Sequence, residues 1–157
     1  MRPLCRIKAL VVTIVALSFS VATGGDEDVL KALERIKAAV EAGASPEELA
    51  PLLDEAKIHI DQLQRGDVRK DCFRAATRRS HYWYGLGVKS WGALIENEKQ
   101  RDRYRRKAEY GEHDMKDISW KMVENYDKLI KQAQEALPSK WEYGNAALDR
   151  ARQCLDQ

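Results

Sequence analysis

The sequence lacks the short motifs by which many enzymes are recognised. It contains no Gly-x-Ser-x-Gly elbow, no His-Glu-x-x-His zinc motif and no glycine-rich phosphate loop. It also contains no Cys-x-x-Cys-His pattern for the covalent attachment of haem. We therefore expect a protein that is not an enzyme and that has no cofactor.

Strand patterns are absent from the sequence as well. No segment alternates apolar and polar residues with a period of two. Apolar residues instead recur at spacings of three and four, and neither a low-complexity tract nor a long linker divides the chain. This pattern predicts an all-α fold, an antiparallel bundle of four to six helices stapled by one disulfide, in a single domain over residues 23–157.

A long apolar run occurs only near the N-terminus. Basic residues precede an apolar run of about eleven residues, 9–19, which is the length of a signal-peptide core. The small residues Ser20 and Ala22 predict cleavage after Ala22, so residues 1–22 are expected to be a signal peptide. An uncleaved anchor would need about 20 apolar residues. We therefore expect no transmembrane span in the mature chain and a periplasmic or extracellular location.

Cysteine is scarce, with three residues in the whole chain. Cys5 precedes the apolar run and leaves with the signal peptide, so Cys72 and Cys154 remain. An exported chain meets an oxidising compartment, and a disulfide between these two is the simplest interpretation. The alternative is two unpaired buried thiols. Closing a loop of about 80 residues would stabilise the fold by roughly 4–5 kcal/mol.

The net charge is small once the signal peptide is removed, because 24 basic residues then face 25 acidic ones. The charges are unevenly distributed: residues 23–64 carry roughly −6, residues 65–107 roughly +8 and residues 108–157 roughly −3. An acidic first part and a basic middle most simply neutralise each other within one fold.

Capping residues mark the first two helices. The first is predicted over residues 26–40 and ends at Gly43. Ser45 and Glu48 form a capping box at the start of the second, and Pro46 occupies the first helical position, where its missing N–H costs nothing. The apolar stripe of the first helix comprises Val29, Leu33, Ile36 and Val40.

A third helix is predicted after Asp67, its expected cap. Gly85, Gly87 and Gly92 each weaken a helix by about 1 kcal/mol relative to alanine. Either a neighbouring helix packs closely there, or the helix breaks near residues 85–87. Residues 96–110 are expected to form a highly charged, solvated helix that breaks near Gly111. The buried stripe of the third helix is expected to comprise Val68, Cys72, Ala75, Ala76, Trp83 and Leu86.

The strongest helical pattern lies between Asp114, an expected cap, and Pro138, an expected stop. Ser139 then begins a second capping box and a last helix, which returns Cys154 towards Cys72. The stripe before Pro138, expected to face the core, comprises Met115, Ile118, Met122, Tyr126, Leu129, Ala133, Ala136 and Leu137, and it is widened by Trp120, Val123 and Ile130.

Two fragments resemble parts of a tetratricopeptide repeat. Trp83-Tyr84-Gly85-Leu86-Gly87 resembles its first helix, and residues 126–138 resemble its second. The fragments are too far apart to belong to one repeat of about 34 residues, so they do not assign the chain to that family. A small tetratricopeptide-like adapter is nevertheless one alternative function.

Aromatic and arginine residues gather in the middle of the chain. Tyr82, Trp83 and Tyr84 fan over more than half of a helix circumference, so at least one of them faces away from the core. Because Tyr, Trp and Arg are enriched at binding hot spots, we expect the protein to bind another protein or an anionic surface, and not nucleic acid. The structural alternative is that the aromatic residues cap the core and the basic run pairs with the acidic first helices. The predicted binding face comprises Arg78, Arg79, Tyr82, Trp83, Tyr84, Trp91, Arg101, Arg103, Tyr104, Arg105 and Arg106.

A metal- or cofactor-carrying bundle is the rival function. Glu109, His113 and Asp117 follow an i, i+4, i+8 spacing that would place them on one face of a helix, and Glu55 and His59 repeat the i, i+4 pair. Carboxylate and imidazole ligands suit zinc or iron between facing helices, but charged residues at this spacing are also common on solvated faces. A haem bound without covalent attachment would take an axial ligand from His81, Met115 or Met122.

Overall fold

The computed structural model describes residues 25–111 and 113–156, and these residues form four helices and no strand. The predicted signal peptide lies outside the described residues. The helices are α1 (Asp26–Glu41), α2 (Pro46–Gln62), α3 (Val68–Tyr110) and α4 (His113–Leu155). They confirm an all-α bundle. None of the described helices has an apolar stretch long enough to cross a membrane.

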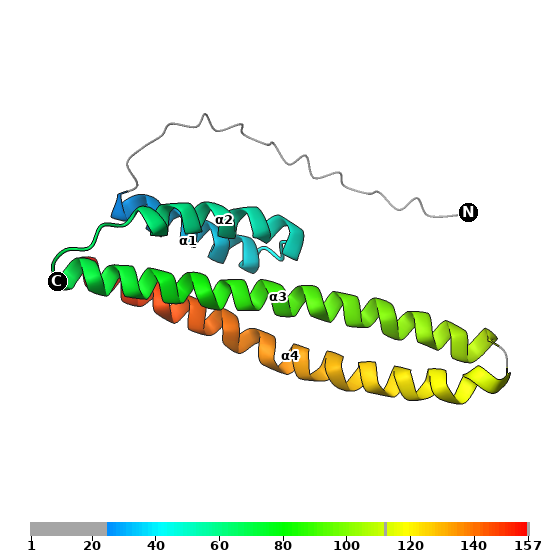
Figure 1. Cartoon of the computed structure of the whole chain (residues 1–157). Coiled ribbons are helices and arrows are strands. Elements are labelled where there is room, and N and C mark those ends of the chain that lie inside the picture. The colour runs from blue at the N-terminus through cyan, green and yellow to red at the C-terminus, as the bar shows by residue number, and fades with distance from the viewer. Residues whose placement is uncertain (1–24, 112, 157) are drawn as a thin grey trace, which may run out of the picture.

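The helices form two hairpins of unequal length. Figure 1 shows α3 and α4 running antiparallel as a long hairpin, with the shorter α1–α2 pair lying beside the half of it that is nearer the C-terminus. We call this half the proximal half. The remainder, residues 96–110 of α3 and 113–131 of α4, extends beyond the α1–α2 pair and is called the distal arm. The molecule is therefore four helices thick at one end and two helices thick at the other.

The predicted caps of α1, α2 and α3 are confirmed. Gly43, which follows α1, has a positive φ of 78°. The Ser45 hydroxyl accepts a hydrogen bond from the Glu48 amide at 3.3 Å, and the Glu48 carboxylate accepts one from the Ser45 amide at 2.7 Å. The Asp67 carboxylate accepts one from the Lys70 amide at 2.9 Å. These bonds satisfy backbone donors that a helix start leaves free.

Of the two alternatives at residues 85–87, the structure has the close approach of a neighbouring helix. α3 runs without interruption through these residues, and Gly87 packs against Trp141 of α4, where a Cβ would lie 2.2 Å from the ring. The predicted stop at Pro138 is wrong. α4 runs through Pro138, which is exposed. Ser139 does not cap a new helix, since its hydroxyl donates to the Ala136 carbonyl at 2.9 Å. Packing along the long hairpin therefore outweighs the local propensity of glycine and proline.

The apolar core belongs to the proximal half. Val29, Leu33 and Ile36 of α1 are fully buried, as the stripe predicted. They pack with residues of α2 and with the ends of α3 and α4. None of the residues in this cluster comes from the distal arm, where Ala108, Val123 and Ile130 are buried only between α3 and α4. The buried cluster comprises Val29, Ala32, Leu33, Ile36, Ala56, Ile60, Leu63, Phe73, Ala76, Tyr84, Leu148, Ala151 and Cys154.

The contact line between α3 and α4, called the seam below, repeats every seven residues. Its positions follow alternating spacings of four and three, which is typical of an antiparallel coiled coil. They are buried or half-buried except at Arg105, which is exposed between Arg101 and Ala108. Many of them are small or polar. The seam comprises Phe73, Thr77, Ser80, Tyr84, Gly87, Trp91, Leu94, Glu98, Arg101 and Ala108 on α3, and Ser119, Val123, Tyr126, Ile130, Ala133, Leu137, Lys140, Gly144, Ala147, Ala151 and Cys154 on α4.

This seam corrects the predicted stripes of α3 and α4. Val68, the first residue of α3, is 87% exposed, and the first buried residue of this helix is Phe73. On α4 the predicted stripe is wrong at Met115, Ile118 and Leu129, which are exposed while Ser119 is buried. It is right at its remaining seam positions, which are Val123, Tyr126, Ile130, Ala133 and Leu137. Part of the predicted stripe is therefore an outer face of α4 over the distal arm.

Candidate functional site

An open groove runs between α3 and α4 in the proximal half. It has a volume of about 690 Å³, and none of its lining residues comes from α1 or α2. Four of its nine lining residues are alanines, so small side chains form much of the lining. The lining comprises Cys72, Ala75, Ala76, Arg79 and Trp83 of α3 and Tyr143, Ala146, Ala147 and Arg150 of α4.

The groove lies on the side of the hairpin away from the α1–α2 pair. The α3 residues that contact α2 are Arg78, whose guanidinium lies 3.9 Å from the Asp61 carboxylate, and His81, whose Nε2 donates to the Leu53 carbonyl at 3.0 Å. At 100° per residue these two side chains point to a different side of α3 from Arg79 and Trp83. The groove is therefore the uncovered face of the four-helix end.

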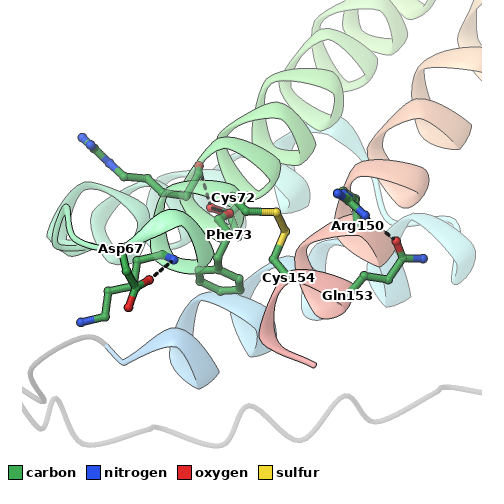
Figure 2. The surroundings of a disulfide bond; sticks show 9 residues. Asp67, Cys72, Phe73, Arg150, Gln153 and Cys154 are labelled. Carbon is green, nitrogen blue, oxygen red and sulfur yellow. Dashed lines mark hydrogen bonds between the residues drawn. A yellow bond between two sulfur atoms is a disulfide. The ribbon is translucent and has the colours of Figure 1, made fainter. Parts of the chain in front are cut away.

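Each end of the groove is fixed by a contact between α3 and α4. At one end the rings of Trp83 and Tyr143 pack with centroids 4.8 Å apart. At the other end Cys72 and Cys154 form the predicted disulfide, with Cα atoms 5.8 Å apart. Figure 2 shows this disulfide joining the two helices, with Arg150 beside it on α4. The groove walls are thus held at a set separation.

Two arginines supply the charge of the groove. Arg79 and Arg150 are both exposed and come from opposite walls. The Arg150 guanidinium donates to the neutral Gln153 side chain at 3.2 Å, and neither arginine pairs with a carboxylate among the described residues. The groove therefore combines an apolar floor with two cationic groups that are available to an acidic ligand.

The structure divides the predicted binding face among several surfaces. Arg79 and Trp83 line the groove, and the exposed Tyr82 packs edge-on against Trp83 with centroids 5.5 Å apart. Arg78 faces α2. Trp91 lies half-buried in the seam. Only the part of the predicted face around Arg79 and Trp83 therefore belongs to one site.

Tyr84 does not belong to any surface, since it is fully buried in the core. Its ring lies over Gly144, where a Cβ would come within 2.8 Å of it, and its hydroxyl donates to the Asn145 side chain at 2.6 Å. Burial raises the pKa of Tyr84 well above its usual value. This corrects its assignment to the binding face: of the three adjacent aromatic residues, it is the one that faces the core.

The remaining predicted residues lie on the distal arm, away from the groove. Arg101 is half-buried in the seam and pairs with Asp102 at 3.0 Å and Asp127 at 3.6 Å; its hydrogen bond to Asp102 raises its pKa. Tyr104 stacks on Tyr126 of α4 with centroids 5.8 Å apart. Exposed positions on the solvent side are occupied by Arg103, Arg105 and Arg106.

The metal hypothesis loses the spacing on which it rested. Glu109 belongs to α3 and Asp117 to α4, since the chain turns at Gly111, so these residues do not share the face of one helix. Glu55 forms an ion pair with Arg35 of α1. Within the described part of the chain, no group of three His, Cys, Asp or Glu side chains is placed to hold a metal ion.

The two tetratricopeptide-like fragments do not form a pair of short helices in the structure. A repeat of about 34 residues contains two short helices, whereas α3 and α4 are each 43 residues long. The two fragments that resemble the repeat lie within these long helices. They reflect aromatic and small residues at the seam and not a repeat.

The α4 wall of the groove was missed by the sequence interpretation. Tyr143, Ala146 and Arg150 follow spacings of three and four, which places them on one face of a helix. That spacing is a usable signal of a common face, but in the sequence alone it is less prominent than the position of Cys154 on the same helix.

No protein-family model, curated protein or solved structure matches the chain.

Proposed function

We propose that this is an exported, non-enzymatic binding protein that holds a helical segment of a partner protein in the groove between α3 and α4. The observation that carries the proposal is the groove itself: an uncovered apolar floor flanked by Arg79, Arg150, Trp83 and Tyr143. Trp, Tyr and Arg are the residue types that contribute most to binding at protein interfaces.

The alanine floor favours a helix as the ligand. Small side chains at Ala75, Ala76, Ala146 and Ala147 let a third helix approach α3 and α4 closely, in the manner of an amphipathic helix bound in a groove. The two arginines on opposite walls favour carboxylates on both flanks of that helix. The preferred ligand is therefore an amphipathic helix with small or medium apolar residues on one face and Asp or Glu beside them.

Export is the second part of the proposal. The disulfide between Cys72 and Cys154 supports it, because disulfides persist mainly in oxidising compartments. We expect the mature protein to begin at residue 23. Intact mass and N-terminal sequencing of the protein recovered from its native location test this, and recovery of a chain that retains residues 1–22 would contradict it.

The groove is tested by placing a photo-crosslinking residue at Ala146 and identifying the protein and peptide that become linked to it. Binding of that peptide is then measured by titration. The double variant Arg79→Ala, Trp83→Ala should weaken binding by more than about tenfold, or 1.4 kcal/mol, while the fold persists.

The matched control is Arg103→Ala, Tyr110→Ala, which removes an arginine and an aromatic ring at exposed positions of the distal arm. This control should bind like the unmodified protein. Equal binding by the groove variant and the unmodified protein, or a linked peptide without a helical apolar face, would overturn the proposal.

A further inference from the structure

The distal arm exposes an apolar row that nothing in the described chain covers. Met115 is 50% exposed, Ile118 is 54% exposed and Leu129 is 39% exposed, with Met122 half-buried between them. Their spacings of three, four and seven place them on one side of α4. Exposed apolar side chains are common singly, but an aligned row of them marks an interaction surface.

The row continues the face that carries the groove. The groove residues Arg79, Trp83, Tyr143 and Arg150 each precede a seam residue by one position. In the distal arm, the residues that precede a buried or half-buried seam residue by one position are Asn97, Gln100 and Lys107 on α3 and Ile118, Met122, Asn125 and Leu129 on α4. We call these seven residues, together with Met115, the distal face.

The distal face is nearly free of charge. Lys107 is its only charged residue, although Asp, Glu, Lys and Arg make up 33% of the chain. Depletion of charge and enrichment in methionine, of which this face has two, are both compositional signals of the core of a protein interface. A face of this composition fits another protein surface better than water.

A row of alternating charge borders the apolar row along α4. It reads Asp117, Lys121, Glu124 and Lys128, all exposed, and none of the four forms an ion pair within the described residues. The signs are minus, plus, minus, plus. Read in the opposite direction they become plus, minus, plus, minus, so the row is complementary to an antiparallel copy of itself.

We propose that the distal arm is a dimerisation surface on which a second copy of this chain packs its own distal face, with the two α4 helices antiparallel. A twofold axis between positions 122 and 123 would pair Asp117 with Lys128 of the other copy and Lys121 with Glu124 of the other copy. The same axis brings each Met122 to the other and sets Met115 near Leu129 of the other copy. This is the self-complementary geometry that a twofold interface requires.

The dimer completes the thin end of the molecule. Two distal arms packed face to face form four helices around the two apolar rows, as the α1–α2 pair completes four helices at the proximal end. The overlap lies beyond the groove, whose lining begins at Trp83 and Tyr143. Dimerisation therefore leaves both grooves open, and the two proposals are independent.

The test uses the purified protein and measures its mass in solution as a function of concentration, by sedimentation or light scattering. The unmodified protein should pass from monomer to dimer. Ile118→Glu, at an exposed position, should raise the dissociation constant by more than about tenfold without lowering the melting temperature. A monomer at every concentration up to about 1 mM would overturn the proposal.

Charge inversion tests the orientation. The acidic-row variant Lys121→Glu, Lys128→Glu and the basic-row variant Asp117→Lys, Glu124→Lys should each be monomeric. Mixed in equal amounts, the two variants should form a heterodimer that native mass spectrometry detects, because every pair across the axis is again of opposite sign.

The control Lys99→Glu, Arg103→Glu makes the same change of charge as Lys121→Glu, Lys128→Glu, but at exposed positions of α3. This control should dimerise normally. Absence of the heterodimer, or loss of dimerisation in the control, would contradict this interface.

Discussion

Glycines within α3 have different roles at the residue scale. A Cβ at Gly87 would lie 2.2 Å from the Trp141 ring, so this residue allows α4 to approach α3. A Cβ at Gly85 or Gly92 would meet nothing within 4 Å. Replacement by alanine is therefore expected to destabilise the fold at Gly87 and to stabilise it at Gly85.

Gly87→Ala should destabilise the protein by about 1–3 kcal/mol, because Trp141 must move to admit the methyl group. Gly85→Ala should stabilise it by about 0.5–1 kcal/mol, since alanine is the better helix former and has space. Urea unfolding of the two variants measures both values. Stabilisation by both substitutions would mean that α4 does not approach α3 at Gly87.

Tyr84 places a titratable group in the core. Its hydroxyl donates to Asn145 at 2.6 Å, so Tyr84→Phe should cost about 0.5–1.5 kcal/mol at neutral pH. Tyr82→Phe, at a position that is 59% exposed, is the control and should cost almost nothing.

The cost of Tyr84→Phe should also depend on pH. Burial raises the pKa of Tyr84 in the folded state above its ordinary value of 10.0. The unfolded state therefore ionises first, and the stability that Tyr84 contributes is complete below pH 10 and declines as the pH rises further. The difference in unfolding free energy between the unmodified protein and Tyr84→Phe should shrink above pH 10. A constant difference up to pH 11 would show that Tyr84 is accessible to water.

At the scale of the element, the sequence predicted the short helices better than the long ones. α1 and α2 have strong local signals, such as the capping box at Ser45 and the stripe that contains Leu33, and both formed as expected. The seam of α3 and α4 instead uses residues such as Thr77, Ser80 and Gly144. Hydrophobic periodicity does not detect small and polar residues, so it assigned exposed residues such as Met115 and Ile118 to the core together with true seam residues such as Tyr126.

The sequence predicted one wall of the groove, which belongs to α3, and missed the other, which belongs to α4. The disulfide followed from there being only two cysteines in the predicted mature chain, and the α3 wall with Arg79 and Trp83 followed from rare residues close together in sequence. The α4 wall was missed, because Tyr143 and Arg150 become neighbours of Trp83 and Cys72 only through the packing of α4 on α3. This packing also accompanies the continuity of α4 through Pro138.

Pro138 within α4 gives a test of that continuity. Its ring removes a backbone donor from the helix interior and clashes with the preceding turn, at a cost of about 3 kcal/mol. Pro138 is exposed, so Pro138→Ala should raise the free energy of unfolding by up to that amount. Pro46→Ala is the contrast, since proline at the first turn of α2 is favourable, and it should give no gain. If Pro138→Ala did not raise the free energy of unfolding either, α4 would be two separate helices in solution.

The two ends of the molecule differ in the number of interactions that stabilise them. The proximal half has the apolar cluster, the α1–α2 pair, an ion pair between Arg152 and Glu34 at 2.9 Å and the disulfide. Because Cys72 and Cys154 are 82 residues apart in sequence, the disulfide constrains the unfolded chain by about 4–5 kcal/mol. The distal arm has only its two-helix seam.

This asymmetry predicts a gradient of amide hydrogen exchange along α3 and α4. In the monomer, backbone amides of residues 97–110 and 115–130 should exchange by opening of the distal arm, with a lower free energy than the amides of residues 73–88 and 141–154, which need global unfolding. Reducing the disulfide should lower the protection of the proximal amides by up to about 4–5 kcal/mol and leave the distal amides almost unchanged, since their opening does not separate Cys72 from Cys154. Both effects are measured by mass spectrometry of exchanged peptides. The protein used is the Ile118→Glu variant, at a concentration at which it is monomeric. Uniform protection along α3, or an equal loss at both ends on reduction, would show that the hairpin unfolds as one unit and that the distal arm is not a separate region of low stability.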